Sequence, residues 1–282
     1  MTVLPPGTEE LIALAFREDI GDGDHTSLST IPADARGAAR LLVKEDGVLA
    51  GVELAQAVAA HFDKALSFRI YLEDGAQVKK GDIAFNLMGP VRSILMVERV
   101  LLNFMQRMSG IATQTRRYVD AVEGTGCRVL DTRKTTPGHR GIEKWAVRLG
   151  GGQNHRHGLY DMIMIKDNHH DFAGGIAKAI EAARSYLVQH GKQLAIEVET
   201  RNLDEVNEVL RVGGVQRIML DNFTPERMRE AVRIIDRRFE TEASGGITLA
   251  TIRSFAETGV DFVSVGALTH SVPSLDLSLK AL

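Results

Sequence analysis

The spacing of apolar and polar residues at the start of the chain predicts a small domain of mixed helix and strand. Runs of branched and aromatic residues predict strands, and apolar residues three and four positions apart predict helices. The expected elements are a helix over 11–20, a strand over 40–44, a helix over 53–62 and a strand over 67–71. This part of the chain is therefore expected to be a small α+β domain.

A long helical stretch follows. Residues 90–122 carry apolar side chains at helical spacing. Ser109 and Gly110 stand inside this stretch, and such a pair weakens a helix. The sequence therefore predicts an interruption there, at the junction with a second domain.

From Cys127 onward, short apolar runs alternate with helical segments, which predicts βαβ units and a parallel sheet. Asn202 and Thr224 stand where helix N-caps belong. The expected strands are 128–130, 162–165, 194–198, 217–220, 241–243 and 262–265, and the expected helices are 174–190, 203–212, 225–237 and 249–258.

A polar group or a glycine turn follows each of these expected strands. The groups are Asp131 to Lys134, Lys166 and Asp167, Glu199, Asp221 and Asn222, Ser244 to Gly246, and Gly266 with Ala267. Polar residues placed repeatedly at the carboxyl ends of parallel strands are how an α/β-barrel builds its active site. The chemistry is expected at that face.

Composition and charge narrow the class of protein. An apolar fraction of 44% and a charged fraction of 25% are typical of a globular domain. The net charge of −3 argues against a nucleic-acid-binding protein. No stretch reaches the length of a membrane span, and no basic n-region precedes an apolar segment, so a cytoplasmic location is expected. Cys127, the single cysteine, is expected to be a buried thiol.

Five cationic or potentially cationic residues fall in one window of the sequence that is otherwise rich in glycine and apolar residues. They are Arg133, Lys134, His155, Arg156 and Lys166. Because they lie at strand ends and beside a glycine run rather than along one helix face, we favour a site for a multiply anionic ligand over a solvated basic surface.

Two glycine turns close the last two expected strands, at Ser244–Thr248 and Val265–Ser271. Barrels often bind phosphate at this place, because glycine lets backbone N–H groups approach the anion. A lone Gly-Gly pair is usually a plain turn. Two such turns on consecutive strands, each with hydroxyls nearby, favour a phosphate site.

Glu199 and Asp221 end neighbouring expected strands and would face one cavity. They could hold Mg²⁺, bind sugar hydroxyls or stabilise positive charge at a reacting carbon. The alternative is a structural ion pair with Lys166 or Arg133. The histidine pairs His155/His157 and His169/His170 do not indicate zinc, since adjacent loop histidines rarely chelate one metal.

At these residues the sequence resembles the nicotinate-nucleotide pyrophosphorylase family, also called quinolinate phosphoribosyltransferase. The matching segments lie in one order over most of the chain, which makes the resemblance more specific than any single motif. They are Glu98–Asn103, Met108–Thr113, Asp131–Thr135, Gly150–Arg156, Ile165–His169, Glu197–Glu199, Leu220–Phe223, Ser244–Gly246 and Val265–His270.

The resemblance implies an enzyme that converts quinolinate and phosphoribosyl pyrophosphate to nicotinate mononucleotide, pyrophosphate and CO₂ in NAD synthesis, with Mg²⁺. It implies an N-terminal α/β sandwich followed by an incomplete, open α/β-barrel, in a homodimer with shared active sites. The expected domains are 1–110, 111–268 and a C-terminal segment, 269–282, that packs back on the first.

The resemblance also assigns roles by position. Arg99, which the residues alone leave as an exposed arginine, is implied to reach the site of the partner subunit. The implied roles are quinolinate binding for Arg99, Arg133, His155, Arg156 and Lys166; catalysis for Lys134, Glu199 and Asp221; phosphate binding for Ser244, Gly245, Gly246, Gly266 and His270; and Mg²⁺ binding, directly or through water, for Asp167, Glu199 and Asp221.

Two other functions remain open at this point. A related enzyme of the same fold could act on another pyridine, or be associated with molybdenum transport, but a monocarboxylate would need fewer cationic partners. The second alternative is a barrel that binds or senses a phosphosugar without catalysis. Its binding of the ligand would be unaffected by changing Glu199 or Asp221 to alanine.

Overall fold

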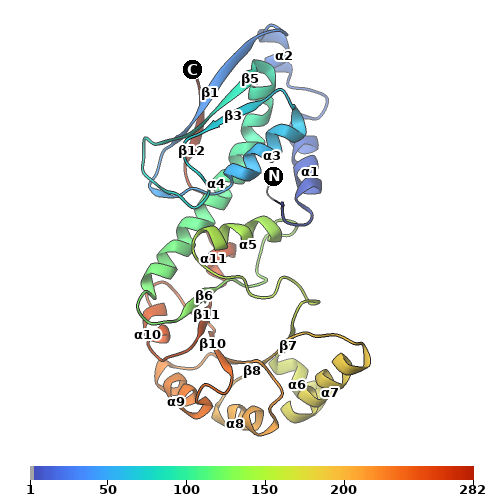
Figure 1. Cartoon of the computed structure of the whole chain (residues 1–282), viewed down its shortest axis with the longest axis vertical. Coiled ribbons are helices and arrows are strands. Elements are labelled where there is room, and N and C mark those ends of the chain that lie inside the picture. The colour runs from blue at the N-terminus through green and yellow to red at the C-terminus, as the bar shows by residue number, and fades with distance from the viewer. Residues whose placement is uncertain (1–2) are drawn as a thin grey trace. The chain divides into compact units, whose positions relative to one another are not determined.

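The computed structural model describes residues 3–282 (Figure 1). The chain forms two compact units, each of which is described here by itself. The first contains the chain up to Arg116 together with 135–151 and 268–282, and the second contains 117–134 and 152–267. The domain boundaries expected from the sequence stay a prediction, and residues 1–2 of the first expected domain lie outside the described part.

The first unit is built on an antiparallel four-stranded sheet with the strand order β12-β1-β5-β3. Its elements are α1 (Thr8–Ile20), α2 (His25–Thr30), β1 (Arg36–Val43), β2 (Gly47–Val48), α3 (Val52–Phe62), β3 (Ser67–Ile70), β4 (Gln77–Val78), β5 (Ile83–Pro90), the start of α4 (Val91–Ala121), α5 (Arg140–Leu149), α11 (Ala267–His270) and β12 (Leu277–Ala281). The helices and strands expected before residue 90 are all present. The last strand, β12, pairs with β1 and brings Ala281 opposite Ala39.

The expected interruption at Ser109 and Gly110 is wrong, because α4 runs unbroken through both residues. Ser109 is fully buried, and its hydroxyl donates to the carbonyl of Ala50 while accepting the N–H of the same residue. A Cβ at Gly110 would lie 2.1 Å from the carbonyl oxygen of Pro273. These small residues therefore let two backbone segments pack closely against the helix, and they do not end it.

The second unit is a six-stranded, wholly parallel sheet with the order β6-β11-β10-β9-β8-β7. Its elements are β6 (Arg128–Leu130), β7 (Ile163–Ile165), α6 (Asp167–Ala173), α7 (Ile176–Gln189), β8 (Ile196–Thr200), α8 (Leu203–Val212), β9 (Arg217–Asp221), α9 (Pro225–Ile235), β10 (Glu240–Ser244), α10 (Ile252–Ala256) and β11 (Phe262–Ser264). Within the described residues β6 and β7 remain the two edges, so the barrel is open. The expected fold class is confirmed.

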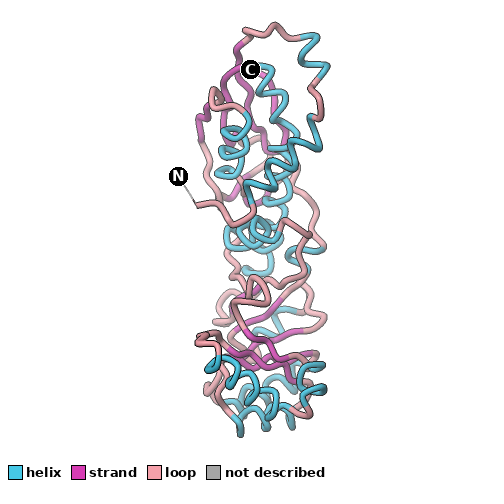
Figure 2. The backbone as a smooth tube through the Cα atoms, turned by 90° about the vertical axis from the view of Figure 1, so that its right-hand side faces the viewer, coloured by secondary structure: helices cyan, strands magenta, loops and turns pink. Residues whose placement is uncertain are grey.

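The helices of the second unit cover one face of its sheet. Helices α7, α8 and α9 lie in a row beneath the strands (Figures 1 and 2), and neighbours in this row contact each other. All five residues of β8 are buried, as expected for a central strand of a parallel sheet. Among residues 3–282, none of the helices combines the length and the apolar character that crossing a bilayer requires.

Candidate active site

The second unit brings most of the expected site residues to one edge of its sheet. Since all six strands are parallel, their carboxyl ends meet there. The residues at or just after those ends are Arg133 and Lys134 after β6, Lys166 and Asp167 after β7, Glu199 in β8, Asp221 in β9, Ser244 in β10 and Gly266 after β11.

A group of three charged side chains lies at the ends of β7, β8 and β9. Lys166 Nζ is 2.6 Å from Glu199 Oε2, and Glu199 is only 5% exposed. Burial raises the pKa of Asp221, and the nearby Glu199 carboxylate raises it further, while Ser244 and Lys166 act in the opposite direction. The carboxylates of Glu199 and Asp221 therefore lie close enough to repel each other, and the ammonium group of Lys166 offsets part of this repulsion.

The turn after β10 needs its first glycine for a steric reason. Gly245 has φ +101°, and a Cβ there would lie 2.2 Å from Oδ1 of Asn222. Asn222 itself has a left-handed φ of 56°, and its amide donates to Asp221 Oδ2 at 2.6 Å. Gly246 has φ +62°, and a Cβ added there would meet no other atom within 4 Å. Gly245 thus leaves room for Asn222, whose amide holds the Asp221 carboxylate. The backbone at Gly246 stays open on its side-chain side.

Two guanidinium groups approach each other near β6 and β7. Burial lowers the pKa of Arg156, and the positive charge of Arg133 lowers it further. Arg156 Nη1 donates to the carbonyl of Met162 at 3.2 Å, while Arg133 and Lys134 lie in an exposed loop. Two neighbouring cations of this kind favour the binding of an anion between them.

Asp131, which is fully buried, holds the loop that carries Arg156. Its Oδ1 accepts the backbone N–H of His155 at 2.8 Å, and its Oδ2 accepts the side-chain amide of Asn154 at 2.6 Å. The backbone of Gln153 bridges to Leu130 in β6. The glycine-rich run before His155 thus ends in a backbone that is fixed to the sheet.

Sequence reasoning missed a buried charged group beneath these residues. The Nε2 atom of His155 is 2.9 Å from Glu197 Oε2 and 3.4 Å from Glu242 Oε2, and both carboxylates are fully buried. Arg217 Nη1 lies 2.9 Å from Glu242 Oε2. The alternation of a strand offers the signal that could have found Glu197, because it shares a face with Glu199 two positions later.

The protonation of His155 reflects these contacts. Burial opposes a charge on the ring, but the hydrogen bonds to Glu197 and Glu242 outweigh it and raise the pKa of His155 to about 9. Burial, helped by Glu242, raises the pKa of Glu197. The backbone N–H of Arg156 points at Nδ1 of the ring at 2.6 Å, so Nδ1 carries no proton in this structure, and the ring is neutral with its proton on Nε2 even though the two carboxylates favour the charged form. Nε2 carries a proton in either form, so the bond to Glu197 does not depend on the charge.

His155, Glu197 and Glu242 also place three possible metal-ligand atoms within 4.8 Å of one another. The surroundings do not favour a cation, however. Arg217 already pairs with Glu242, and Nε2–H of His155 already points at Glu197. The group is therefore an ion-pair network, and a metal would have to displace both of these partners.

The remaining expected site residues lie in other surroundings. Asp167 is the first residue of α6, and its backbone N–H lies 3.5 Å from Glu199 Oε1. Arg99 and His270 belong to the first unit, where both are exposed. Nδ1 of His270 is 2.7 Å from the hydroxyl of Ser271.

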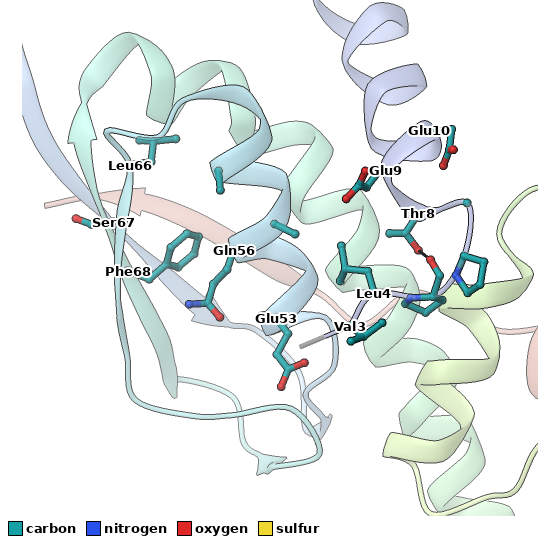
Figure 3. Close-up of a pocket in the computed structure, with 15 residues that line it drawn as sticks. Val3, Leu4, Thr8, Glu9, Glu10, Glu53, Gln56, Leu66, Ser67 and Phe68 are labelled. Atoms are coloured by element: carbon teal, nitrogen blue, oxygen red, sulfur yellow. Dashed lines mark hydrogen bonds between the residues drawn. The ribbon is translucent and has the colours of Figure 1, made fainter. Parts of the chain in front are cut away.

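The first unit has a hollow of its own, with a volume of about 940 Å³, among α1, α3 and β3 (Figure 3). Glu9, Glu10 and Glu53 line it together with apolar side chains such as Leu4 and Phe68. Carboxylates on the wall make this hollow unsuited to an anionic ligand. The cationic edge of the second unit remains the candidate site.

Comparison with known proteins agrees with this geometry. The family model of the quinolinate phosphoribosyl transferase N-terminal domain matches residues 24–109, and that of the C-terminal domain matches residues 111–280. The chain belongs to the quinolinate phosphoribosyltransferase family. The resemblance carried by the sequence segments is thereby confirmed.

Members of this family from plants and bacteria match nearly the whole chain. Quinolinate phosphoribosyltransferase [decarboxylating] 2, mitochondrial, of Nicotiana glauca is 47% identical over 96% of the chain and 81% of its own length. The probable nicotinate-nucleotide pyrophosphorylase [carboxylating] of Bacillus subtilis is 42% identical over 96% of the chain and 92% of its own. Among solved structures, NadC from Streptococcus pyogenes superposes with a TM-score of 0.94 at 41% identity, over the full length of both chains.

Proposed function

We propose that the protein is a decarboxylating quinolinate phosphoribosyltransferase, which joins quinolinate to phosphoribosyl pyrophosphate and releases nicotinate mononucleotide, pyrophosphate and CO₂ in NAD synthesis. Its membership of the family supports this. The observation that carries the proposal is the meeting, at one sheet edge, of the Arg133–Arg156 pair with the group formed by Lys166, Glu199 and Asp221.

The cationic residues suit the acid substrate. Quinolinate carries two adjacent carboxylates, which planar guanidinium groups bind by paired, charge-assisted hydrogen bonds. The positive charge of Arg133 lowers the pKa of Arg156, and an anion bound beside both guanidinium groups would offset this effect. Lys166 adds an ammonium group, and His155 contributes through the backbone of Arg156, since both of its ring nitrogens have partners in the protein.

The carboxylates suit the transfer of the ribosyl group. The ring nitrogen of quinolinate attacks C1 of the ribose while the bond from C1 to the pyrophosphate oxygen breaks. Positive charge develops at C1, and Glu199 and Asp221 stabilise it. Lys134 offsets charge on the departing pyrophosphate. The alkylated ring nitrogen then withdraws electrons, the C2 carboxylate leaves as CO₂, and C2 takes up a proton.

The turn after β10 suits the phosphate of the ribosyl donor. The expected phosphate-binding residues Ser244, Gly245, Gly246 and Gly266 follow β10 and β11, and His270 follows shortly after in the chain. At Gly246 the backbone is exposed and has no neighbour on its side-chain side. Backbone N–H groups in such a turn can approach a phosphate closely.

Mg²⁺ fits the same edge. Asp167, Glu199 and Asp221 offer the hard carboxylate oxygens that this ion prefers, and mutual repulsion at Asp221 favours a cation nearby. Mg²⁺ would be held by these residues, directly or through water, and would neutralise charge on the pyrophosphate.

A homodimer with shared sites is part of the proposal. Arg99 lies exposed on α4, in a position suited to contact a second copy of the chain. A cytoplasmic location remains a prediction from the sequence.

The test is a product assay with purified protein, Mg²⁺ and both substrates. We expect pyrophosphate and CO₂ in equal amounts, together with nicotinate mononucleotide. Turnover of nicotinate in place of quinolinate would point to a relative that acts on another pyridine. Tight binding of the phosphoribosyl donor without any product, unchanged by Glu199→Ala, would point to a binding protein.

A further inference from the structure

The buried charges of the second unit form a layer directly beneath the candidate site. Glu197, Arg217 and Glu242 lie in the central strands β8, β9 and β10, with Glu197 opposite Arg217 in the register. Side chains two positions apart in a strand share a face. Glu199, Asp221 and Ser244 lie farther along the same three strands and on that same face, at the sheet edge where the substrates are proposed to bind.

This layer is an unusual filling for a barrel, whose interior layers are dominated by branched apolar residues. Two fully buried carboxylates are costly unless they are paired, and apolar residues of similar volume often stabilise as well or better. Glu197 even leaves Oε1 without a hydrogen-bond partner among the described residues. Stability alone therefore does not account for the charges.

The ring of His155 connects this layer to the site. On one side, Nε2–H donates to Glu197, with Glu242 at 3.4 Å. On the other side, Nδ1 accepts the N–H of Arg156. Because an imidazole ring is rigid, fixing Nε2 also fixes where Nδ1 points, and so fixes the backbone from which the Arg156 side chain leaves.

We propose that Glu197 and Glu242 act as positioning residues for Arg156, through the histidine ring that lies between them. This rests on the proposed function, in which Arg156 binds a carboxylate of quinolinate. Arg217 anchors the network from below. It pairs with Glu242, and its guanidinium stacks on the ring of Phe262 at 4.1 Å, which holds it in place.

The network contacts Arg156 through His155, and it does not include the residues proposed to act on the ribosyl donor. Glu199 and Asp221 have their own partners in Lys166, Ser244 and Asn222. Substitutions in the buried layer should therefore weaken the binding of quinolinate and leave the binding of the phosphoribosyl donor unchanged. A purely structural layer would affect both substrates or the stability alone.

The test compares two substitutions at Glu197 in the active, full-length protein, with a matched control. Glu197→Leu removes the acceptor for Nε2–H, and we expect the KM for quinolinate to rise by about tenfold to a hundredfold, as for a misplacement of about 1 Å. The KM for phosphoribosyl pyrophosphate should change by less than about twofold. Glu197→Gln keeps an acceptor oxygen at the same place and should recover most of the loss, as rescue by a conservative variant.

Glu240→Gln is the control, because Glu240 pairs with the same Arg217 at 3.0 Å, but its side chain is 48% exposed and forms no ion pair with His155 among the described residues. It should leave both KM values unchanged. Glu242→Leu, which removes the carboxylate that faces His155 and Arg217, is the second network variant in case Glu197→Leu does not fold, and it should raise the KM for quinolinate alone. Thermal unfolding of each variant checks that it is folded.

Equal rises in both KM values, a lower melting temperature with unchanged KM values, or an effect of Glu240→Gln equal to that of Glu242→Leu would overturn the positioning role. An inactive wild-type protein would instead overturn the proposed function itself. The two failures are therefore distinguishable in one series of assays.

Discussion

Removing Arg217 should destabilise the second unit by leaving buried carboxylates without their counter-charge. The Arg217 side chain is 12% exposed and that of Glu242 is fully buried, so the pair is shielded from water. Breaking a buried pair by removing one partner costs about 3–5 kcal/mol. Because Nε2–H of His155 still faces Glu242, we expect Arg217→Met to fall at the lower end, about 3 kcal/mol.

That loss is measurable by differential scanning calorimetry. A change of 1 kcal/mol shifts the melting temperature by about 2–4 °C for chains of roughly 150–250 residues, so Arg217→Met should lower it by about 6–12 °C. Arg128→Met is the matched control. Arg128 stacks on the same Phe262 ring at the same 4.1 Å, but it is exposed and forms no ion pair among the described residues.

Arg128→Met should therefore cost only the stacking contribution, about 0.5–1 kcal/mol. The difference between the two variants measures the ion pairs of Arg217, and the pair with buried Glu242 should dominate because the Glu240 side chain is 48% exposed. If both variants lowered the melting temperature equally, or if Arg217→Met cost less than about 1 kcal/mol, the reasoning about buried charge would be refuted.

Three further outcomes follow from the site. Arg133→Ala should weaken quinolinate binding more than binding of the ribosyl donor, as measured by the two KM values; equal losses would contradict the division of the pocket. Gly245→Ala should raise the KM for the ribosyl donor, because a Cβ would lie 2.2 Å from Oδ1 of Asn222; wild-type kinetics would show that the turn can adjust. Mixing Arg99→Ala chains with Arg133→Ala chains should restore part of the activity in mixed dimers, and no rescue in verified mixed dimers would argue against shared sites.

The regular part of the fold could be predicted because local signals and the tertiary structure agree. The helix expected over 203–212 is α8 with the same bounds, and the side chain of Asn202 caps it by accepting the N–H of Glu205. Thr224 caps α9 in the same way. A polar residue or a glycine turn after each strand, a feature of the sequence alone, also predicted the sheet edge at which the candidate site lies.

Other features depend on partners distant in sequence and could not be predicted. Gly110 looked like a helix breaker because only the folded chain reveals that Pro273 packs against it. The short helix α6 was missed because its histidine-rich sequence has no apolar periodicity, and its start is fixed by His169 Nδ1 accepting the N–H of Lys166. Expected helix 174–190 starts later, at Ile176, because Gly174 and Gly175 both have positive φ.

The buried network was missed for a related reason. Charged residues at strand ends draw attention as candidates for catalysis, whereas Glu197 and Glu242 stand inside strands and look like surface positions of an alternating pattern. Their partners, His155 and Arg217, come from two separate segments of the chain. Only the three-dimensional structure reveals that their charges offset one another.

The pairing of β12 with β1 has a consequence for how the chain is made. The edge of β1 stays uncovered until residues 277–281 have left the ribosome, although its other neighbour, β5, is complete much earlier. The second unit is synthesised almost entirely within that interval. During translation the β1 edge of the first sheet is therefore exposed, and strands of other chains could pair with it. The pairing of residues 277–281 with β1 then covers this edge and protects it from aggregation.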